Sequence, residues 1–157
     1  MKNLSAVKFE ALLVKLVACS EARDWARGKT LREMWNTCER GDWMLWLAAR
    51  YGDVPLKTLV AIACDAAEPA MACVPAGETR PQECLATTRR WLKDEATIEE
   101  VYAAAWAVGA AEAAAWAAGA AGAAEAAGAA GAAARAAGAE SLRFSADLCR
   151  KYIEVRP

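Results

Sequence analysis

The stretch CSEARDWARGKTLREMWNTCERGDWMLWLAARY, residues 19–51, contains the signals that decide the fold. Thr30 followed by Glu33 has the spacing of a capping box, in which each side chain bonds the backbone N–H of the other residue at a helix start. Ser20 and Asp42 are residue types that cap helices, and each precedes a run with helical periodicity. The stretch is therefore expected to form three short helices, over 21–27, 31–39 and 43–51.

Similar signals continue on both sides of this stretch. Thr97 and Glu100 repeat the capping-box spacing, and Ser141 is expected to cap the last helix. Proline and glycine punctuate 68–81, which is predicted to be a loop. The remaining helices are expected over 4–18, 55–67, 82–93, 98–139 and 142–152. No alternating, β-branched run of strand length occurs, so the expected fold class is all-α.

The chain length of 157 residues suggests one compact multi-helix domain. Its expected parts are tryptophan- and cysteine-containing helices in 1–97, an alanine- and glycine-rich helical segment in 98–139, and a C-terminal helix in 140–157. Alanine is the best helix former, so the middle part is interpreted as one long helix or a helical hairpin. One straight helix would be roughly 60 Å long, against a domain diameter of about 40 Å. A break or bend is therefore expected within 117–131.

Four of the seven tryptophans lie in the first half of the chain. Trp43, Trp46 and Leu47 lie on one face of their predicted helix, and Trp25 and Trp35 on the two preceding helices are candidates for the same cluster. One interpretation is a core in which the indoles pack against the slim alanine- and glycine-rich segment. The other is an exposed aromatic patch that binds a ligand. The sequence leaves both open.

The composition argues against catalysis. The chain has no histidine, which removes Ser–His and Cys–His nucleophile pairs and every histidine-ligated metal site. No carboxylates have the spacing of a metal-binding loop, and no phosphate-binding glycine motif follows a strand. We therefore expect a non-catalytic binding protein without a cofactor or metal. A net charge of −1 gives no field that would attract nucleic acid, so no nucleic-acid partner is expected.

Six cysteines are present, without a C-x-x-C pair. Charged residues interrupt the first 15 residues, so no secretion signal is predicted there. No segment is apolar enough to predict a membrane span. The cysteines are accordingly expected to be reduced, mostly buried thiols in a cytoplasmic protein.

Arginine beside tryptophan is the pattern that indicates a binding site, because guanidinium groups and indoles together bind planar anions. A solvated, salt-bridged helix surface is the alternative interpretation of the same pattern. The candidate binding residues are Arg23, Arg27, Arg40, Trp43, Trp46, Arg89 and Arg90.

The strings CSEARDWARGKTLREMW (19–35) and ERGDWMLWL (39–47) resemble a bacterial and phage family of immunity proteins associated with polymorphic toxin systems. The resemblance continues in RRWLKDEAT (89–97), in the alanine-rich middle and in ADLCRKYI (146–153). It implies an antitoxin-type protein that neutralises a cognate toxin protein by direct binding. Acidic side chains outnumber basic ones nine to five in 51–100, so this section is a candidate surface for a basic toxin.

Two other functions stay open. The first is a phage-type protein that sequesters a small anionic ligand, such as a nucleotide signal, in an arginine and tryptophan pocket. The second is a structural homo-oligomer in which the alanine- and glycine-rich helices pair between subunits.

Overall fold

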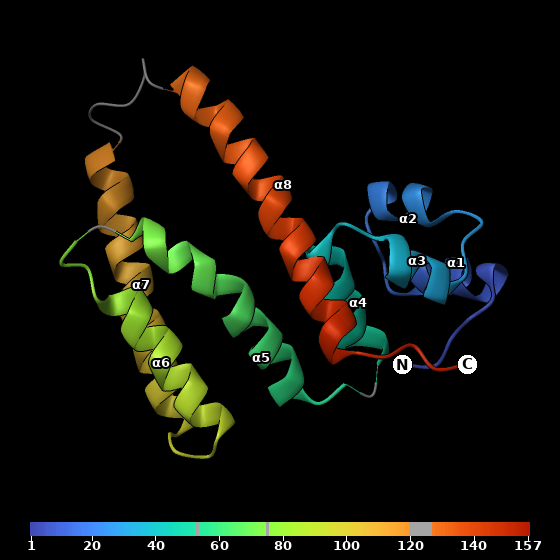
Figure 1. The fold of residues 1–157 in the computed structure, drawn as a ribbon, viewed down its shortest axis with the longest axis horizontal. Helices are drawn as coiled ribbons and strands as arrows, with labels where there is room; N and C mark the ends of the chain where they lie inside the picture. The colour runs from blue at the N-terminus through green and yellow to red at the C-terminus, as the bar shows by residue number, and fades with distance from the viewer. Residues whose placement is uncertain (53, 75, 120–126) are drawn as a thin grey trace. The chain divides into compact units, whose positions relative to one another are not determined.

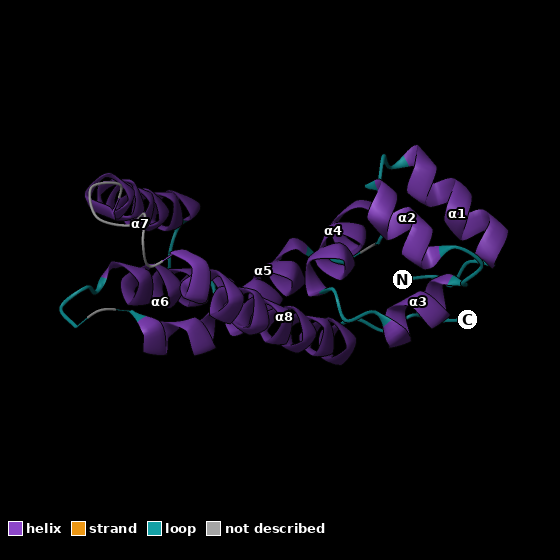
Figure 2. Cartoon of the chain, turned by 90° about the horizontal axis from the view of Figure 1, so that it is seen from above, coloured by secondary structure: helices purple, strands orange, loops and turns teal. Residues whose placement is uncertain are grey.

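The structure is a computed structural model that describes residues 1–52, 54–74, 76–119 and 127–157, with backbone alone at 70, 73, 109–119 and 127–137. Every regular element in these ranges is helical, which confirms the all-α prediction (Figures 1 and 2). The helices are α1 (Ala6–Lys15), α2 (Ser20–Ala26), α3 (Leu31–Thr37), α4 (Gly41–Tyr51), α5 (Leu56–Ala67), the 3-10 helix η1 (Glu68–Cys73), α6 (Arg80–Leu92), α7 (Ile98–Gly119) and α8 (Ala127–Tyr152).

Both predicted capping boxes are confirmed. The Thr30 hydroxyl accepts a hydrogen bond of 3.2 Å from the backbone N–H of Glu33, and the Glu33 carboxylate accepts one of 2.7 Å from the N–H of Thr30. Thr97 and Glu100 make the same two bonds at the start of α7, at 3.3 and 2.7 Å. Each box satisfies two N–H groups that have no partner inside the helix.

The other predicted caps are wrong. Ser20 is the first residue of α2, with Cys19 before it in the cap position, and Asp42 is the second residue of α4. Ser141 lies well inside α8, and its carbonyl accepts the Ser145 hydroxyl. The alanine-rich residues before Ser141 continue the helix, so no cap is needed there.

The 68–81 segment is only partly a loop. It begins with the 3-10 helix η1, and α6 starts at Arg80 rather than at residue 82. The expected break in 117–131 falls mainly on residues 120–126, which lie outside the described residues, so the choice between one helix and a hairpin stays a prediction.

The chain divides into two compact units. The first comprises Met1–Ile62 with Glu140–Pro157, and the second comprises Ala63–Ala139. Whether these two units form the single domain that the sequence predicted over 1–157 stays a prediction. In the second unit, α6 packs along α7.

The core of the first unit draws on both ends of the chain. Its fully or almost fully buried side chains include Phe9, Leu31, Trp35, Met44, Leu47, Ala146, Cys149 and Ile153. Arg150 of α8 donates to the carbonyl oxygens of Trp35, at 3.1 Å, and of Cys38, where α3 ends. These bonds satisfy carbonyls that have no partner inside α3. The C-terminal turns of α8 thereby complete the core and fix the junction between α3 and α4.

The terminal segments run side by side. The Met1 ammonium group donates to the Glu154 carbonyl at 2.8 Å. Backbone bonds of 2.8 Å join Asn3 to Arg156 and Arg156 to Met1. This parallel bridge ties the two terminal segments together within the first unit, and N and C are marked near each other in Figure 1.

Candidate functional site

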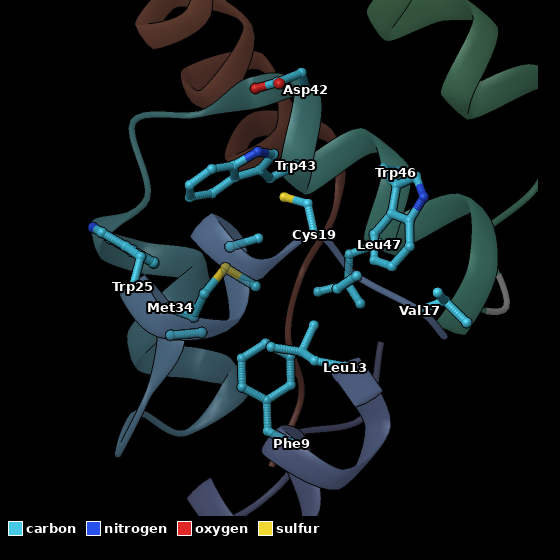
Figure 3. A pocket seen from close by; sticks show the side chains of 13 residues that line it. Phe9, Leu13, Val17, Cys19, Trp25, Met34, Asp42, Trp43, Trp46 and Leu47 are labelled. Carbon is cyan, nitrogen blue, oxygen red and sulfur yellow. The ribbon is translucent and has the colours of Figure 1, made fainter. Parts of the chain in front are cut away.

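A cavity of about 460 Å³ opens in the first unit among α1, α2, the segment before α2, and α4 (Figure 3). Its lining is apolar apart from the carboxylate of Asp42 and the thiol of Cys19. The volume is in the range of ligand pockets rather than packing defects. The lining residues are Phe9, Leu13, Val17, Ala18, Cys19, Ala22, Trp25, Ala26, Met34, Asp42, Trp43, Trp46 and Leu47.

Helix periodicity explains why these side chains meet. Trp43, Trp46 and Leu47 share one face of α4, as predicted, and all three line the cavity. On α2 the equivalent face carries Trp25 between two alanines, whose small side chains leave the space open. The ring centroids of Trp25 and Trp43 are 6.2 Å apart and tilted by 60°.

Trp35 does not line the cavity, although the sequence made it a candidate for the same cluster. It is only 2% exposed and belongs to the core of the first unit. Trp35 therefore fits the interpretation of a tryptophan core. Trp25, Trp43 and Trp46 are half-buried at a cavity, which fits the interpretation of an aromatic binding surface. The sequence also predicted that these indoles pack against the alanine- and glycine-rich segment 98–139. Most side chains of that segment lie outside the described residues, so this stays a prediction.

Each cavity tryptophan has a cation of the protein stacked on its ring. Lys29 Nζ lies 4.4 Å from the Trp25 centroid, Arg40 Cζ lies 4.2 Å from Trp43, and Arg50 Cζ lies 5.1 Å from Trp46. None of the three cations lines the cavity. They hold the indoles by cation–π attraction without occupying the cavity.

Arg40 is already neutralised by its neighbour. Its Nε and Nη2 atoms donate to the two carboxylate oxygens of Asp42 at 2.9 and 2.7 Å, and Nη1 lies 3.5 Å from Glu21. The hydrogen bonds from Arg40 hold the pKa of Asp42 below its usual value. Because of this fork-shaped pair, Arg40 supports Trp43 from outside the cavity and is not a ready anion receptor.

Arg23 and Arg27 face a second hollow, a groove of about 290 Å³ between α1 and α2. Arg27 pairs with Asp24 at 2.6 Å, and Glu10 across the groove accepts the Gly28 backbone N–H at 2.7 Å. Within the described part of the chain, the side chain of Arg23 makes no ion pair or hydrogen bond, and only its backbone N–H donates, to the Cys19 carbonyl at 3.1 Å. It is therefore the available cation of the groove.

Arg89 and Arg90 belong to the second unit, on α6. Arg89 pairs with Glu68 at 2.6 Å and with Asp65 at 3.4 Å, and Arg90 donates to the Glu95 carbonyl at 3.0 Å. These bonds give both arginines structural partners, so the structure favours the salt-bridged interpretation for them. Asp65 and Glu68, which pair with Arg89, belong to the acidic section 51–100 that was predicted as a surface for a basic toxin. Asp53 of the same section lies outside the described residues.

Val17 is a cavity residue whose role the sequence analysis missed. It follows α1 with φ of +57°, and the bonds Val17 N–H to Val14 O and Ala18 N–H to Leu13 O close the helix end. Glycine is the usual residue in this conformation, and a β-branched residue is strained there. The side chain is nevertheless 85% exposed at the cavity. The predicted helix over 4–18 includes Val17, so no signal in the sequence marked the helix end before it.

The remaining chemistry of the described residues is limited. Among them no group of three or more potential ligands could hold a metal ion, and none of their helices has both the length and the apolar character that crossing a membrane requires. Burial raises the pKa of Cys38, and that of Cys149 to about 11, so these thiols are protonated, unreactive core residues.

Comparison with family models, with curated proteins and with solved structures found no match for this chain.

Proposed function

We propose that this protein is a non-catalytic binding protein of the antitoxin type, which neutralises a toxin by binding it through the aromatic cavity. The observation that carries the proposal is the open cavity walled by Trp25, Trp43 and Trp46. The resemblance to immunity proteins supplies the class of partner.

The cavity has the properties of an interaction hot spot. Tryptophan and arginine dominate the binding energy of protein interfaces, and they act best where a side chain of the partner enters a preformed pocket. Here the indoles are fixed by their cations before a partner arrives. Binding therefore requires little ordering of the site, which favours affinity.

Sequestration of a small anion has less support. Arg40 is paired with Asp42, Arg27 is paired with Asp24, and the cavity wall itself carries the Asp42 carboxylate. An anion in the cavity would meet that negative charge and an otherwise apolar surface, which is unfavourable.

One observation supports the alternative function of a structural homo-oligomer. Tyr102 and Trp106 lie four residues apart on α7 and are 63% and 79% exposed, as in a face that pairs between copies. Light scattering over a range of concentrations tests this proposal, because a monomer at all concentrations contradicts it.

Co-expression with the candidate toxin tests the main proposal. The candidate is the product of the gene next to this one, and the readout is survival of the host. We expect the unaltered protein to protect, and Trp43→Ala to lose protection because a wall of the cavity is removed. Trp106→Ala is the matched control, since it removes an exposed indole of the second unit, and it should protect fully.

A second variant guards against misfolding of Trp43→Ala. Ala22→Phe fills the cavity from α2 and keeps every tryptophan, so it should also abolish protection while the helical circular dichroism spectrum is unchanged. Full protection by both Trp43→Ala and Ala22→Phe would overturn the proposal.

A further inference from the structure

Within the ranges that the structure describes, three cations near the cavity make no ion pair with a carboxylate. Arg27 and Arg40 form ion pairs with Asp24 and Asp42, but no ion pair joins Arg23, Lys29 or Arg50 to any described residue. Lys29 and Arg50 stack on indoles, and Lys29 also donates to the Trp25 carbonyl. The groove also carries the carboxylates of Glu10, which accepts the Gly28 N–H, and of Asp24, which pairs with Arg27, so the cation there with a free side chain is Arg23.

Helix α2 separates the cavity from the groove that contains Arg23. Ala22, Trp25 and Ala26 line the cavity, whereas Arg23 and Arg27 line the groove. Leu13 of α1 lines both hollows, so the two share a wall. A segment lying across α1 and α2 would reach both at once.

The two hollows differ in what they can hold. The cavity is apolar and carries the Asp42 carboxylate, so it accepts an apolar or aromatic side chain and disfavours an acidic one. The groove offers the unpaired Arg23 guanidinium, which suits a carboxylate. Between them Val14 and Val17, which are 59% and 85% exposed, add apolar surface.

We infer that the partner is a protein segment that places an apolar or aromatic side chain in the cavity and an acidic side chain, within about one helical turn of it, against Arg23. This inference rests on the proposed function and adds the chemistry of the partner. Lys29 and Arg50 strengthen the preference for an acidic segment through longer-range attraction.

Blocked peptides test the inference on the intact chain. The probes are Ac-Leu-Phe-Glu-Glu-Leu-NH2 and its counterpart with both glutamates replaced by lysine. Neither contains tryptophan, so the intrinsic fluorescence of the cavity indoles reports binding. We expect the glutamate peptide to bind about two- to fivefold more tightly at low ionic strength, as suits one exposed ion pair. The difference should shrink as salt is added.

Charge reversal locates the effect. Arg23→Glu should abolish or invert the preference, whereas Lys93→Glu makes the same change of sign on the second unit and should leave it intact. A preference for the lysine peptide, an unchanged preference in Arg23→Glu, or no saturable signal with either peptide up to on the order of 10 mM would overturn the inference.

Three further results distinguish a protein segment from a small acid as the occupant of the site, and this inference from the proposed function. If free phenylacetate binds as tightly as the glutamate peptide, the site takes a small amphiphilic acid, and the inference of a protein segment is wrong. If the protein protects against the toxin without any charge preference, the inference fails and the proposed function stands. If the preference is present but protection is absent, the proposed function fails instead.

Discussion

At the scale of single residues, the cavity depends on pairs formed by close neighbours in the chain. Arg40 stacks on Trp43 and binds Asp42 with two nitrogens, so one guanidinium fixes an indole and neutralises a carboxylate. The sequence analysis named Arg40 and Trp43 as candidates, and the structure brings them together. The sequence pattern predicted that Arg40 would bind an anion. In the structure its guanidinium is already paired with the Asp42 carboxylate, and the sequence alone could not show that these two side chains turn toward each other.

Replacing Asp42 tests this pair. The pKa of Asp42 is lower in the folded state than its ordinary value of 3.8, so the pair stabilises the fold above that pH. The stabilisation is lost as the pH falls through the lowered pKa. Asp42→Asn should therefore reduce the free energy of unfolding at neutral pH, by less than about 1 kcal/mol because the pair is partly exposed. Urea titrations at pH 7 and about pH 2 measure this, and an equal loss at both pH values would contradict it.

Val17 gives a prediction of the opposite sign. Glycine can adopt the left-handed conformation of residue 17 without strain. Val17→Gly should therefore raise the free energy of unfolding by about 0.5–1 kcal/mol. Little packing is lost, because the side chain is 85% exposed. Val14→Gly is the control: it lies inside α1 and should be destabilising by about 1 kcal/mol. Thermal unfolding distinguishes the two, and destabilisation by both would show that Val17 is unstrained in solution.

At the scale of helices, local signals predicted a start correctly only where both members of a capping pair are present, whereas the predicted ends at 51, 67, 93 and 152 agree with the structure within one residue. The boxes at Thr30 and Thr97 were predictable because both partners lie within four residues. Ser141 misled the analysis, because a capping residue type is effective only where the preceding residues leave the helix, and the alanine-rich segment before it does not. The strained end of α1 could not be anticipated without the contacts that hold Val17.

Two glycines give a test of helix packing. A Cβ at Gly41 would lie 2.4 Å from the Ser145 Cβ and 2.6 Å from the Ala146 nitrogen, so α4 and α8 could not approach as they do. Gly41→Ala should therefore be destabilising by roughly 1–3 kcal/mol.

Gly138 is the matched control, since a Cβ there has no neighbour within 4 Å. Gly138→Ala should stabilise α8 by up to about 1 kcal/mol through helix propensity. Calorimetric melting temperatures of the two variants should shift in opposite directions. A neutral Gly41→Ala would show that the contact between α4 and α8 is looser in solution.

At the scale of the whole molecule, the first unit is assembled from segments far apart in the chain. Periodicity showed which side chains of α4 share a face, but it could not show that α1 supplies Phe9 and Leu13 to the same cavity. Nor could it show that Arg89 and Arg90 lie in the other unit. Those facts depend on packing between elements, for which a single sequence carries no direct signal.

Truncation tests how far the first unit depends on its distant segment. A chain ending at residue 139 lacks Ala146, Cys149 and Ile153, which are all at most 5% exposed. It should show no cooperative unfolding transition and no near-ultraviolet circular dichroism from ordered tryptophans. A chain ending at residue 153 keeps these residues, so it should unfold cooperatively at a lower temperature. A cooperative transition in the shorter chain at the temperature of the full chain would contradict this prediction.

The parallel bridge between Lys2 and Arg156 has a consequence for synthesis. The ribosome releases the N-terminal helices first, and they must wait for the last residues before their core can close. Contacts of such long sequence separation slow folding, and a waiting chain exposes its apolar side chains. We therefore expect the core of the first unit, and with it the cavity, to close only after the residues up to Arg156 have been synthesised.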